Sequence, residues 1–381
     1  MKIGIVCYPT FGGSGVVATE LGKALADRGH QVHFITYNQP ARLDFFSANL
    51  FYHEVSVSKY PLFDYQPYEL ALASRMVDVV RFEKLDLLHV HYAIPHASAA
   101  FMAKQILLTY GIYIPVVTTL HGTDITLVGK DRTFKPVVTF SINKSDGVTA
   151  VSQNLRDNTY EFFEIERDIK VIPNFIDLSR FSLKAKDHFK KAIAPEGEKI
   201  LIHTSNFRRV KRTEDVIRIF AKVIQKIPSK LLMVGDGGER SDCEQLCRDL
   251  GVSANVRFLG KQDAIEEILS VGDLFLMPSQ SESFGLAALE AMACKVPVIS
   301  SNAGGLPELN VDGVTGYLKD VGDVDGMAEK AIYILEDEAR LAQFKDNALA
   351  RAKEFDLTNI LPQYENYYAE VLEQAKASNL L

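Results

Sequence analysis

Short apolar runs alternate with longer stretches of helical periodicity along this chain, and the whole pattern occurs twice. In the first half, strands are predicted at 2–8, 31–37, 85–92, 115–120 and 147–152, with helices between them, for example at 16–28 and 97–110. In the second half, strands are predicted at 200–204, 230–234, 255–259, 273–277 and 296–300. Runs that are apolar throughout are typical of parallel strands covered by helices on both faces. The sequence therefore predicts an α/β fold with two doubly wound domains built from βαβ units.

The length of 381 residues fits two domains of ordinary size. A polar segment at 178–198 is predicted to link an N-terminal domain at 1–185 to a C-terminal domain at 186–355, both Rossmann-like. Residues 356–381 hold a helix, and the sequence leaves open whether it packs back onto the N-terminal domain. The helix carries apolar and aromatic residues at helical spacing, namely Leu361, Tyr364, Tyr367, Tyr368 and Leu372. Two such domains facing across a cleft would place a ligand at the carboxyl ends of their strands.

The bulk composition counts against several classes of protein. A net charge of −7 and a pI near 5.8 lack the basic footprint of a nucleic-acid binder and argue against stable membrane association. Neither a signal-peptide pattern nor an apolar run of about 18 residues is visible. The four cysteines lack the paired spacing of a zinc site. A reduced, cytoplasmic protein is expected, and its oligomeric state, homo-oligomer or monomer, is left open.

The segment between Glu282 and Glu290 is the most informative for function. A Gly-containing turn opens an apolar helix there, and a carboxylate lies at each end of the unit. Helix N-termini attract phosphate through unpaired N–H groups, and carboxylates accept hydrogen bonds from sugar hydroxyls. The pattern favours a sugar joined to a diphosphate. The alternative is an ordinary amphipathic helix with one solvated glutamate and one glutamate at its N-terminus.

Further polar motifs follow the predicted strands. Phe11-Gly12-Gly13-Ser14-Gly15 precedes a helix, but no acidic residue follows the second strand, as NAD binding would require. Residues 205–212 include four cations in five positions, which suits a diphosphate. The loops at 235–237 and 303–308 could bring backbone close to a ligand. Each of these motifs could also be plain turn chemistry.

Histidines lie at two strand ends in the first half. His121 follows the strand at 115–120 and could contact a substrate or polarise a leaving group. His89 and His91 would lie on one face of their strand, which raises a weak metal hypothesis, since no carboxylate or cysteine lies at a suggestive spacing. Tyr92, at the end of the same strand, is a better candidate for a substrate contact.

Taken together, these motifs resemble the retaining glycosyltransferases of family four, which have the GT-B fold. The resemblance covers almost the whole chain, and its most specific element is the Glu282–Glu290 unit, followed in order by 303–308 and 313–317. It implies a hexosyltransferase that uses a UDP-sugar and needs neither a cofactor nor a metal. The implied catalytic residues are His121, Lys211 and Glu282. The implied donor contacts are Gly13, Arg208, Lys211, Glu282, Ser283, Phe284, Gly285, Leu286 and Glu290.

Residues 7–15, 89–96 and 205–211 are similar to one branch of that family. The branch opens bacillithiol biosynthesis by moving N-acetylglucosamine from UDP-GlcNAc to the hydroxyl of L-malate with retention. By this resemblance the malate contacts are Ser14, Tyr92, Thr119 and Asn206. Many relatives carry Arg where this chain has Asn206, so its assignment to donor or acceptor stays open. The other hypotheses are a sibling transferase that uses an inositol phosphate or lipid sugar, a UDP-sugar epimerase, and a non-catalytic sugar-binding protein.

A retaining enzyme with a covalent intermediate needs a carboxylate nucleophile near the anomeric carbon. Asp124 is the nearest candidate in the first domain, and its position is not convincing. We therefore expect front-face substitution, in which positioning and leaving-group stabilisation by Lys211 and Arg208 carry catalysis.

Overall fold

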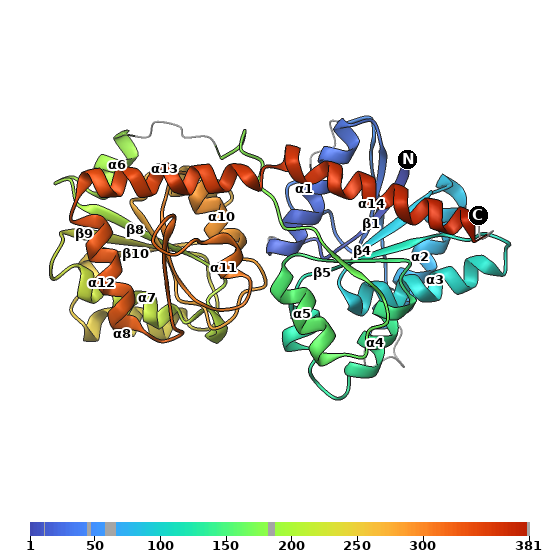
Figure 1. Ribbon diagram of the computed structural model, residues 1–381, viewed down its shortest axis with the longest axis horizontal. Coiled ribbons are helices and arrows are strands. Elements are labelled where there is room, and N and C mark those ends of the chain that lie inside the picture. The colour runs from blue at the N-terminus through green and yellow to red at the C-terminus, as the bar shows by residue number, and fades with distance from the viewer. Residues whose placement is uncertain (11, 44–46, 58–65, 182–186, 379–381) are drawn as a thin grey trace. The chain divides into compact units, whose positions relative to one another are not determined.

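The structure is a computed structural model that describes residues 1–10, 12–43, 47–57, 66–181 and 187–378. The chain divides into two compact units, the first formed by Met1–Asn174 with Thr358–Leu381 and the second by Phe175–Leu357 (Figure 1). The division falls after Asn174 because the next residues pair with the end of the second unit. Ile176 donates its N–H to Phe355 O and accepts from Leu357 N.

The first unit is a seven-stranded parallel sheet in the order β3-β2-β1-β4-β5-β6-β7. Its strands are β1 (Lys2–Val6), β2 (Gln31–Thr36), β3 (Leu50–Glu54), β4 (Leu87–His91), β5 (Val116–Leu120), β6 (Gly147–Ala150) and β7 (Ile169–Val171). Its helices and turns are α1 (Gly13–Asp27), α2 (Tyr68–Glu83), η1 (Ala93–Ala97), α3 (Ser98–Leu108), η2 (Thr123–Leu127), α4 (Lys135–Lys144), α5 (Gln153–Phe162) and α14 (Leu357–Ala377). The five strands predicted from the sequence form the middle of this sheet, and β3 and β7 are its edges.

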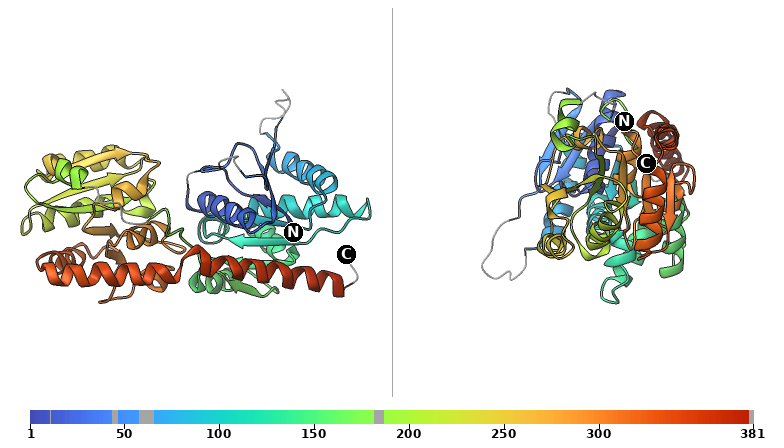
Figure 2. Two further views of the ribbon diagram at one scale, coloured as in Figure 1. Left: turned by 90° about the horizontal axis from the view of Figure 1, so that it is seen from above. Right: turned by 90° about the vertical axis from the view of Figure 1, so that its left-hand side faces the viewer.

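Helices cover both faces of this sheet. On one face, α2 and α3 pack on alternate residues of the central strands, such as Ile35, Leu88 and Val90. On the other face lies α14, whose Tyr367 hydroxyl donates to Val148 O of β6 and accepts from Val148 N. Figure 2 shows α14, in red, lying along one side of this unit. The C-terminal helix is therefore part of the first unit, although it follows the second in sequence.

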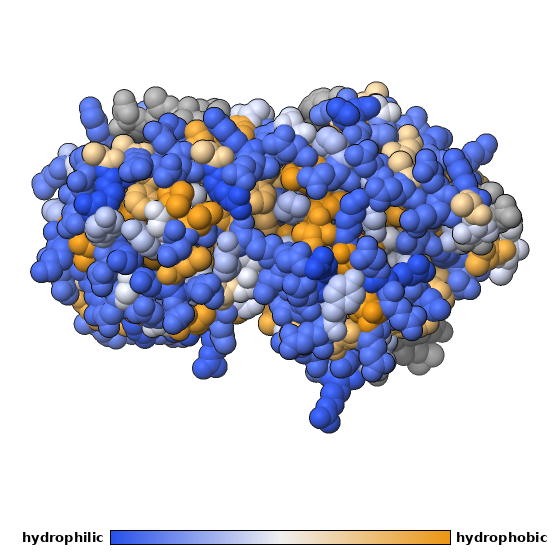
Figure 3. Space-filling view, viewed as in Figure 1, coloured by the Kyte–Doolittle hydropathy of each residue, from blue (hydrophilic) through white to orange (hydrophobic). Residues whose placement is uncertain are grey.

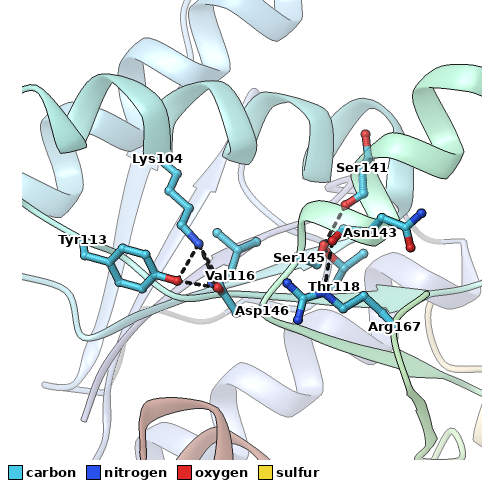
Figure 4. Close-up of polar contacts among 9 residues, drawn as sticks. All are labelled: Lys104, Tyr113, Val116, Thr118, Ser141, Asn143, Ser145, Asp146 and Arg167. Atoms are coloured by element: carbon cyan, nitrogen blue, oxygen red, sulfur yellow. Dashed lines mark hydrogen bonds and ion pairs between the residues drawn. The ribbon is translucent and has the colours of Figure 1, made fainter. Parts of the chain in front are cut away.

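A buried ion pair fixes the amino ends of β5 and β6 (Figure 4). Lys104 of α3 donates to both oxygens of Asp146, at 2.8 and 2.6 Å, and the Tyr113 hydroxyl donates to the same carboxylate. Asp146 also accepts the N–H of Val116, the first residue of β5. Because the ammonium and both carboxylate oxygens are hydrogen-bonded, the pair fixes the starts of β5 and β6 and leaves no uncompensated charge there. It lies at the strand ends opposite those where ligands of parallel sheets bind.

The second unit is a six-stranded parallel sheet in the order β10-β9-β8-β11-β12-β13. Its strands are β8 (Lys199–Thr204), β9 (Ser229–Val234), β10 (Val256–Gly260), β11 (Leu274–Met277), β12 (Val298–Ser301) and β13 (Gly316–Lys319). Its helices and turns are α6 (Asp187–Ile193), η3 (Arg209–Lys211), α7 (Thr213–Val223), α8 (Arg240–Asp249), η4 (Ser253–Asn255), α9 (Ile265–Leu269), α10 (Leu286–Ala293), α11 (Leu306–Leu309), α12 (Val324–Leu335) and α13 (Glu338–Glu354). The prediction of a plain linker at 178–198 is wrong where α6 forms, since Ile193 is buried and Lys190 pairs with Asp273.

Most apolar side chains are buried in the cores of the two units, and the face of the molecule in Figure 3 is largely hydrophilic. In the second unit, Phe207, Phe220 and Phe344 join strand residues in one cluster. Among the described residues, none of the helices combines the length and the apolarity needed to cross a bilayer.

Candidate active site

The loop between β11 and α10 positions Glu282 by close packing of backbone. A Cβ at Gly304 would lie 1.9 Å from the carbonyl oxygen of Glu282, and one at Gly305 would lie 2.3 Å from that of Ser283. Gly305 donates its N–H to Glu282 O at 2.8 Å. Only glycine permits this approach, so the loop at 303–308 supports the Glu282 segment from behind.

Helix α10 begins directly after the loop that carries Glu282, with Gly285 at φ +100° as its N-cap. Phe284 is buried and packs edge-on against Phe355, so only its backbone is available to a ligand. Leu286 opens the helix and is half-buried, as are Ser283 before it and Glu290 in its second turn. The first turn of α10 holds no acidic residue that would compete for its N–H groups. This helix start has the polarity that an anion needs.

Lys211 and Glu282 form an ion pair at the same place. Lys211 Nζ lies 2.7 Å from Glu282 Oε1, and their side chains are 21% and 10% exposed. Lys211 closes the short turn η3, and Val210 O accepts the N–H of Gln280, which holds the two loops together. A cation and a carboxylate thus lie side by side. That arrangement suits a ligand with a diphosphate and sugar hydroxyls.

The other cations of this turn divide into two groups. Arg212 is tied to Asp215 at the start of α7, with Nε to Oδ2 at 2.6 Å, so it stabilises the helix N-terminus. Arg208 and Arg209 are exposed and pair with no carboxylate among the described residues. Asn206 is also exposed, one residue before the buried Phe207. Arg208, which the resemblance implies as a donor contact, is therefore available to a ligand, and so is Arg209.

Gly235 and Gly237 support the cationic turn. A Cβ at Gly235 would lie 1.8 Å from Ser205 O, and one at Gly237 would lie 2.5 Å from Phe207 O. Phe207 N donates to Asp236 O at 3.0 Å. The Gly-Asp-Gly loop is therefore a close-packing element beneath residues 205–207.

In the first unit, the start of α1 meets the end of β4. The Tyr92 hydroxyl donates to Ser14 Oγ at 2.6 Å, and both residues are half-buried. Gly13, the first residue of α1, is exposed, whereas Gly15 lies so close to Tyr8 O that a Cβ there would be 2.5 Å away. Phe11 lies outside the described residues. Tyr92 has φ +86°, an unfavourable value for a tyrosine, and such strain concentrates at functional sites.

Asp124 is a structural carboxylate. It is 2% exposed, and it accepts N–H groups from Ala93, at 2.9 Å, and Gly122, at 3.0 Å. Burial raises its pKa to about 6, and these hydrogen bonds oppose the shift. Because both oxygens are engaged inside the protein, Asp124 links the loops that follow β4 and β5. Its burial and these hydrogen bonds count against a role as the nucleophile.

Comparisons with known proteins identify the family. Residues 184–351 match the family described as "Glycosyl transferases group 1", and residues 11–180 match "Glycosyltransferase Family 4". The chain is 49% identical over 378 residues to a protein of Bacillus anthracis named N-acetyl-alpha-D-glucosaminyl L-malate synthase, covering 99% of this chain and 98% of that protein. This chain belongs to the family-four glycosyltransferases.

A solved structure shares the fold of this glycosyltransferase, and a more distant relative matches it in sequence. Anabaena Alr3699/HepE, crystallised with UDP and glucose, matches with a TM-score of 0.82 at 24% identity, covering 97% of this chain and 99% of that one. D-inositol 3-phosphate glycosyltransferase 2 of Catenulispora acidiphila is 26% identical over 403 residues, covering 96% of this chain and 92% of that protein. The predicted GT-B fold and family are confirmed.

The remaining predicted residues of the glycosyltransferase lie deeper. Thr119 is fully buried, and its hydroxyl lies 2.7 Å from both His89 Nε2 and Thr149 Oγ1. His121 is 8% exposed, and its Nε2 lies 2.8 Å from His91 Nδ1. The structure thus brings Tyr92 together with Ser14, and Lys211 with Glu282. It places the Thr119 hydroxyl behind the surface.

A metal hypothesis finds little support among the described residues of this glycosyltransferase. His89 and His91 share a face of β4, as predicted, but His89 contacts Thr119 of β5 and His91 contacts His121, directly after β5. His33, His53 and Glu83 do bring three ligand atoms within 4.8 Å of one another. However, the buried Nε2 of His33 has no partner among the described residues, and metal-bound histidines donate that N–H to an acceptor. We therefore assign no metal to the cluster.

Two supporting features escaped the sequence analysis. The loop at 303–308 was predicted either to approach a ligand or to be a plain turn, but not to support Glu282, and the structural role of Asp124 was not foreseen. A signal for the first exists in the sequence, because paired glycines after a strand mark close backbone approach.

Proposed function

We propose that the chain is a retaining glycosyltransferase that transfers N-acetylglucosamine from UDP-GlcNAc to the hydroxyl of L-malate. The observation that carries the proposal is the 49% identity to the Bacillus anthracis malate synthase over nearly the full length of both chains. The D-inositol 3-phosphate enzyme is much less similar, at 26%. The acceptor is therefore assigned to malate rather than to an inositol phosphate.

The second unit holds the donor in this proposal. The Lys211 ammonium and Arg208 neutralise the diphosphate with the start of α10, and Glu282 accepts hydrogen bonds from sugar hydroxyls. Glu290, one turn into α10, contacts the ribose. Support comes from the Lys211–Glu282 ion pair, which lies beside the N-terminus of α10. Since these groups supply positive charge, the transfer needs neither a metal nor a cofactor.

The first unit holds the acceptor. Tyr92 and Ser14 contact malate, and His121 contacts the donor sugar. Asn206, which stands where many relatives have Arg, keeps both assignments, to the donor and to the acceptor. The malate hydroxyl oxygen forms the new bond to the anomeric carbon as the bond from that carbon to the diphosphate oxygen breaks. The hydroxyl proton passes to the departing diphosphate, which leaves as UDP. Front-face substitution is favoured because Asp124 is occupied by backbone N–H groups.

We also place the enzyme in a reduced, cytoplasmic setting, which the four free and buried cysteines support. Each thiol lies in the protein interior, where burial raises its pKa and keeps it unreactive.

The test measures UDP release and product mass with UDP-GlcNAc alone, with L-malate, with succinate and with D-inositol 3-phosphate. Succinate is the matched control, since it keeps both carboxylates but lacks the hydroxyl. We expect release only with L-malate, and a product whose anomeric proton shows the α configuration. Release with the inositol phosphate alone would keep the family and overturn the acceptor. Conversion of the sugar without any acceptor would support an epimerase.

A further inference from the structure

The two histidines of β4 contact Thr119 of β5 and His121, the residue that directly follows β5. Each partner lies two positions beyond the residue opposite the histidine. The strands are parallel, with His89 opposite Val117 and His91 opposite Thr119. His89 therefore reaches Thr119, and His91 reaches His121. Both histidines are fully buried, on the face of the sheet that α14 covers. The residues that they contact belong to the strand end assigned above to the site.

The hydrogen bonds of His91 have a definite direction. Burial, with the neighbouring histidines, lowers the pKa of His91 well below its ordinary value, so the ring is neutral and carries one proton. Its Nε2 is buried and has no partner among the described residues. An unpaired buried N–H is rarer in proteins than an unpaired buried acceptor. The proton therefore lies on Nδ1, which donates to His121 Nε2 at 2.8 Å.

The hydrogen bond from His91 determines the tautomer of His121. Burial lowers its pKa to about 3, so it is also neutral. With Nε2 accepting, its own proton lies on Nδ1. Nδ1 has no hydrogen-bond partner among the described residues, and the side chain keeps 8% of its surface exposed. His121 thus offers an N–H donor, rather than a base, to an oxygen of the ligand.

His89 forms a second chain of hydrogen bonds, in which each donor points from α14 toward β5. The Tyr368 hydroxyl of α14 is fully buried and lies 2.7 Å from His89 Nδ1. A buried phenol needs an acceptor, so it donates to Nδ1, and His89 donates from Nε2 to Thr119 Oγ1. Thr119 in turn accepts the N–H of Tyr92 on its carbonyl at 2.9 Å. The C-terminal helix thereby supports the strand end that carries Tyr92.

We propose that His89 and His91 are positioning residues for the transfer. His91 fixes the tautomer of His121, so that His121 is a hydrogen-bond donor at Nδ1. Tyr368 fixes the tautomer of His89, and His89 holds Thr119, whose carbonyl accepts the N–H of Tyr92. Only the identity of the ligand that His121 and Tyr92 contact rests on the function proposed above. The proton positions themselves do not depend on it.

The direct test reads the tautomers. Nitrogen-15 chemical shifts of histidine, recorded on the full chain with labelled histidine, distinguish a proton on Nδ1 from one on Nε2. Signals are assigned with variants in which one histidine at a time is replaced. We expect the proton of His121 on Nδ1 and that of His89 on Nε2. A proton on Nε2 of His121 would overturn the proposal whatever the substrate proves to be.

The functional test compares two substitutions of His91. His91→Asn keeps an N–H near the position of Nδ1, whereas His91→Leu fills the space without a donor. His91→Leu leaves Nε2 of His121 without its donor, and the loss of one partner of a buried hydrogen bond corresponds to about 10–100-fold. We therefore expect His91→Leu to lose that much in kcat/KM and His91→Asn to recover most of it. Equal losses in two variants of unchanged thermal stability would contradict the assignment.

A third variant examines α14. Tyr368→Phe removes the donor to His89 and keeps the ring in the core. We expect the His89 proton to redistribute between its two nitrogens in the same nitrogen-15 spectra, while His121 keeps its tautomer. An unchanged His89 signal would show that Tyr368 does not set its tautomer.

Discussion

Lys211 is the single residue whose charge the proposed chemistry needs most. Its ammonium is the cation held beside Glu282 at the start of α10. Because removal of one group that stabilises leaving-group charge costs roughly 10²–10³ in rate, Lys211→Ala should lower kcat by that factor. The measurement is the initial rate of UDP release at saturating donor and acceptor.

Lys222 provides a matched control. It lies on α7 of the same unit and pairs with the exposed Asp325 at 2.8 Å. Since surface ion pairs contribute little, Lys222→Ala should leave the rate and the thermal stability almost unchanged. Equal rates for the two variants would remove Lys211 from the mechanism.

Residue types at strand ends could be predicted from the sequence, but their pairings could not. Lys211 and Glu282 were both singled out by their chemistry, and the structure adds that they form an ion pair. The contact between His91 and His121 depends on the register of β4 against β5, which residue spacing within one strand does not contain. The burial of Thr119 follows from the same register and from α14.

At the scale of elements, the loop before α11 determines where Glu282 lies. Gly304 has φ +60° and would place a Cβ 1.9 Å from Glu282 O. Gly304→Ala therefore adds overpacking to backbone strain, and we expect it to lower the free energy of unfolding by about 2–4 kcal/mol. Because the loop carrying Glu282 must shift, UDP-GlcNAc should also bind more weakly, which calorimetric titration would measure.

Gly251 separates these two effects. It has φ +70°, but nothing lies within 4 Å of a Cβ built there. Gly251→Ala should therefore lose only about 1 kcal/mol of stability, from backbone strain, and should bind the donor normally. Normal donor binding by Gly304→Ala would show that the loop does not position Glu282.

The strands that the sequence failed to predict share one property: β3, β7 and β13 are all edge strands. Central strands are buried on both faces, so they occur as continuous apolar runs. β3 (Leu50–Glu54) is only partly buried and ends in His53 and Glu54, and β7 has three residues. Each of the three pairs on one side only, with the strand that precedes it in sequence. An edge strand therefore lacks the continuous apolar run by which the sequence reveals a central strand.

At the scale of the whole molecule, the chain completes its first unit only after it has built the second. Tyr364, Tyr367 and Tyr368 of α14 are buried in the first unit, some 190 residues after the chain left it at Asn174. The apolar face of α14 was visible in the sequence, whereas its partner was not, because periodicity defines a face without saying what covers it. The stability of the first unit therefore depends on a distant segment.

That dependence can be measured with Tyr367→Phe. The change leaves the ring in place but removes the hydroxyl that bonds both Val148 N and Val148 O of β6. Because a buried backbone group left unpaired costs about 1–3 kcal/mol, amide exchange should rise in β6 and α14 and stay unchanged in the second unit. Tyr333→Phe is the control, since Tyr333 lies exposed on α12 of the second unit. The exchange pattern of this variant should match that of the parent chain. If Tyr367→Phe raised exchange equally in both units, the two would unfold as one, and the division of stability inferred from the fold would be wrong.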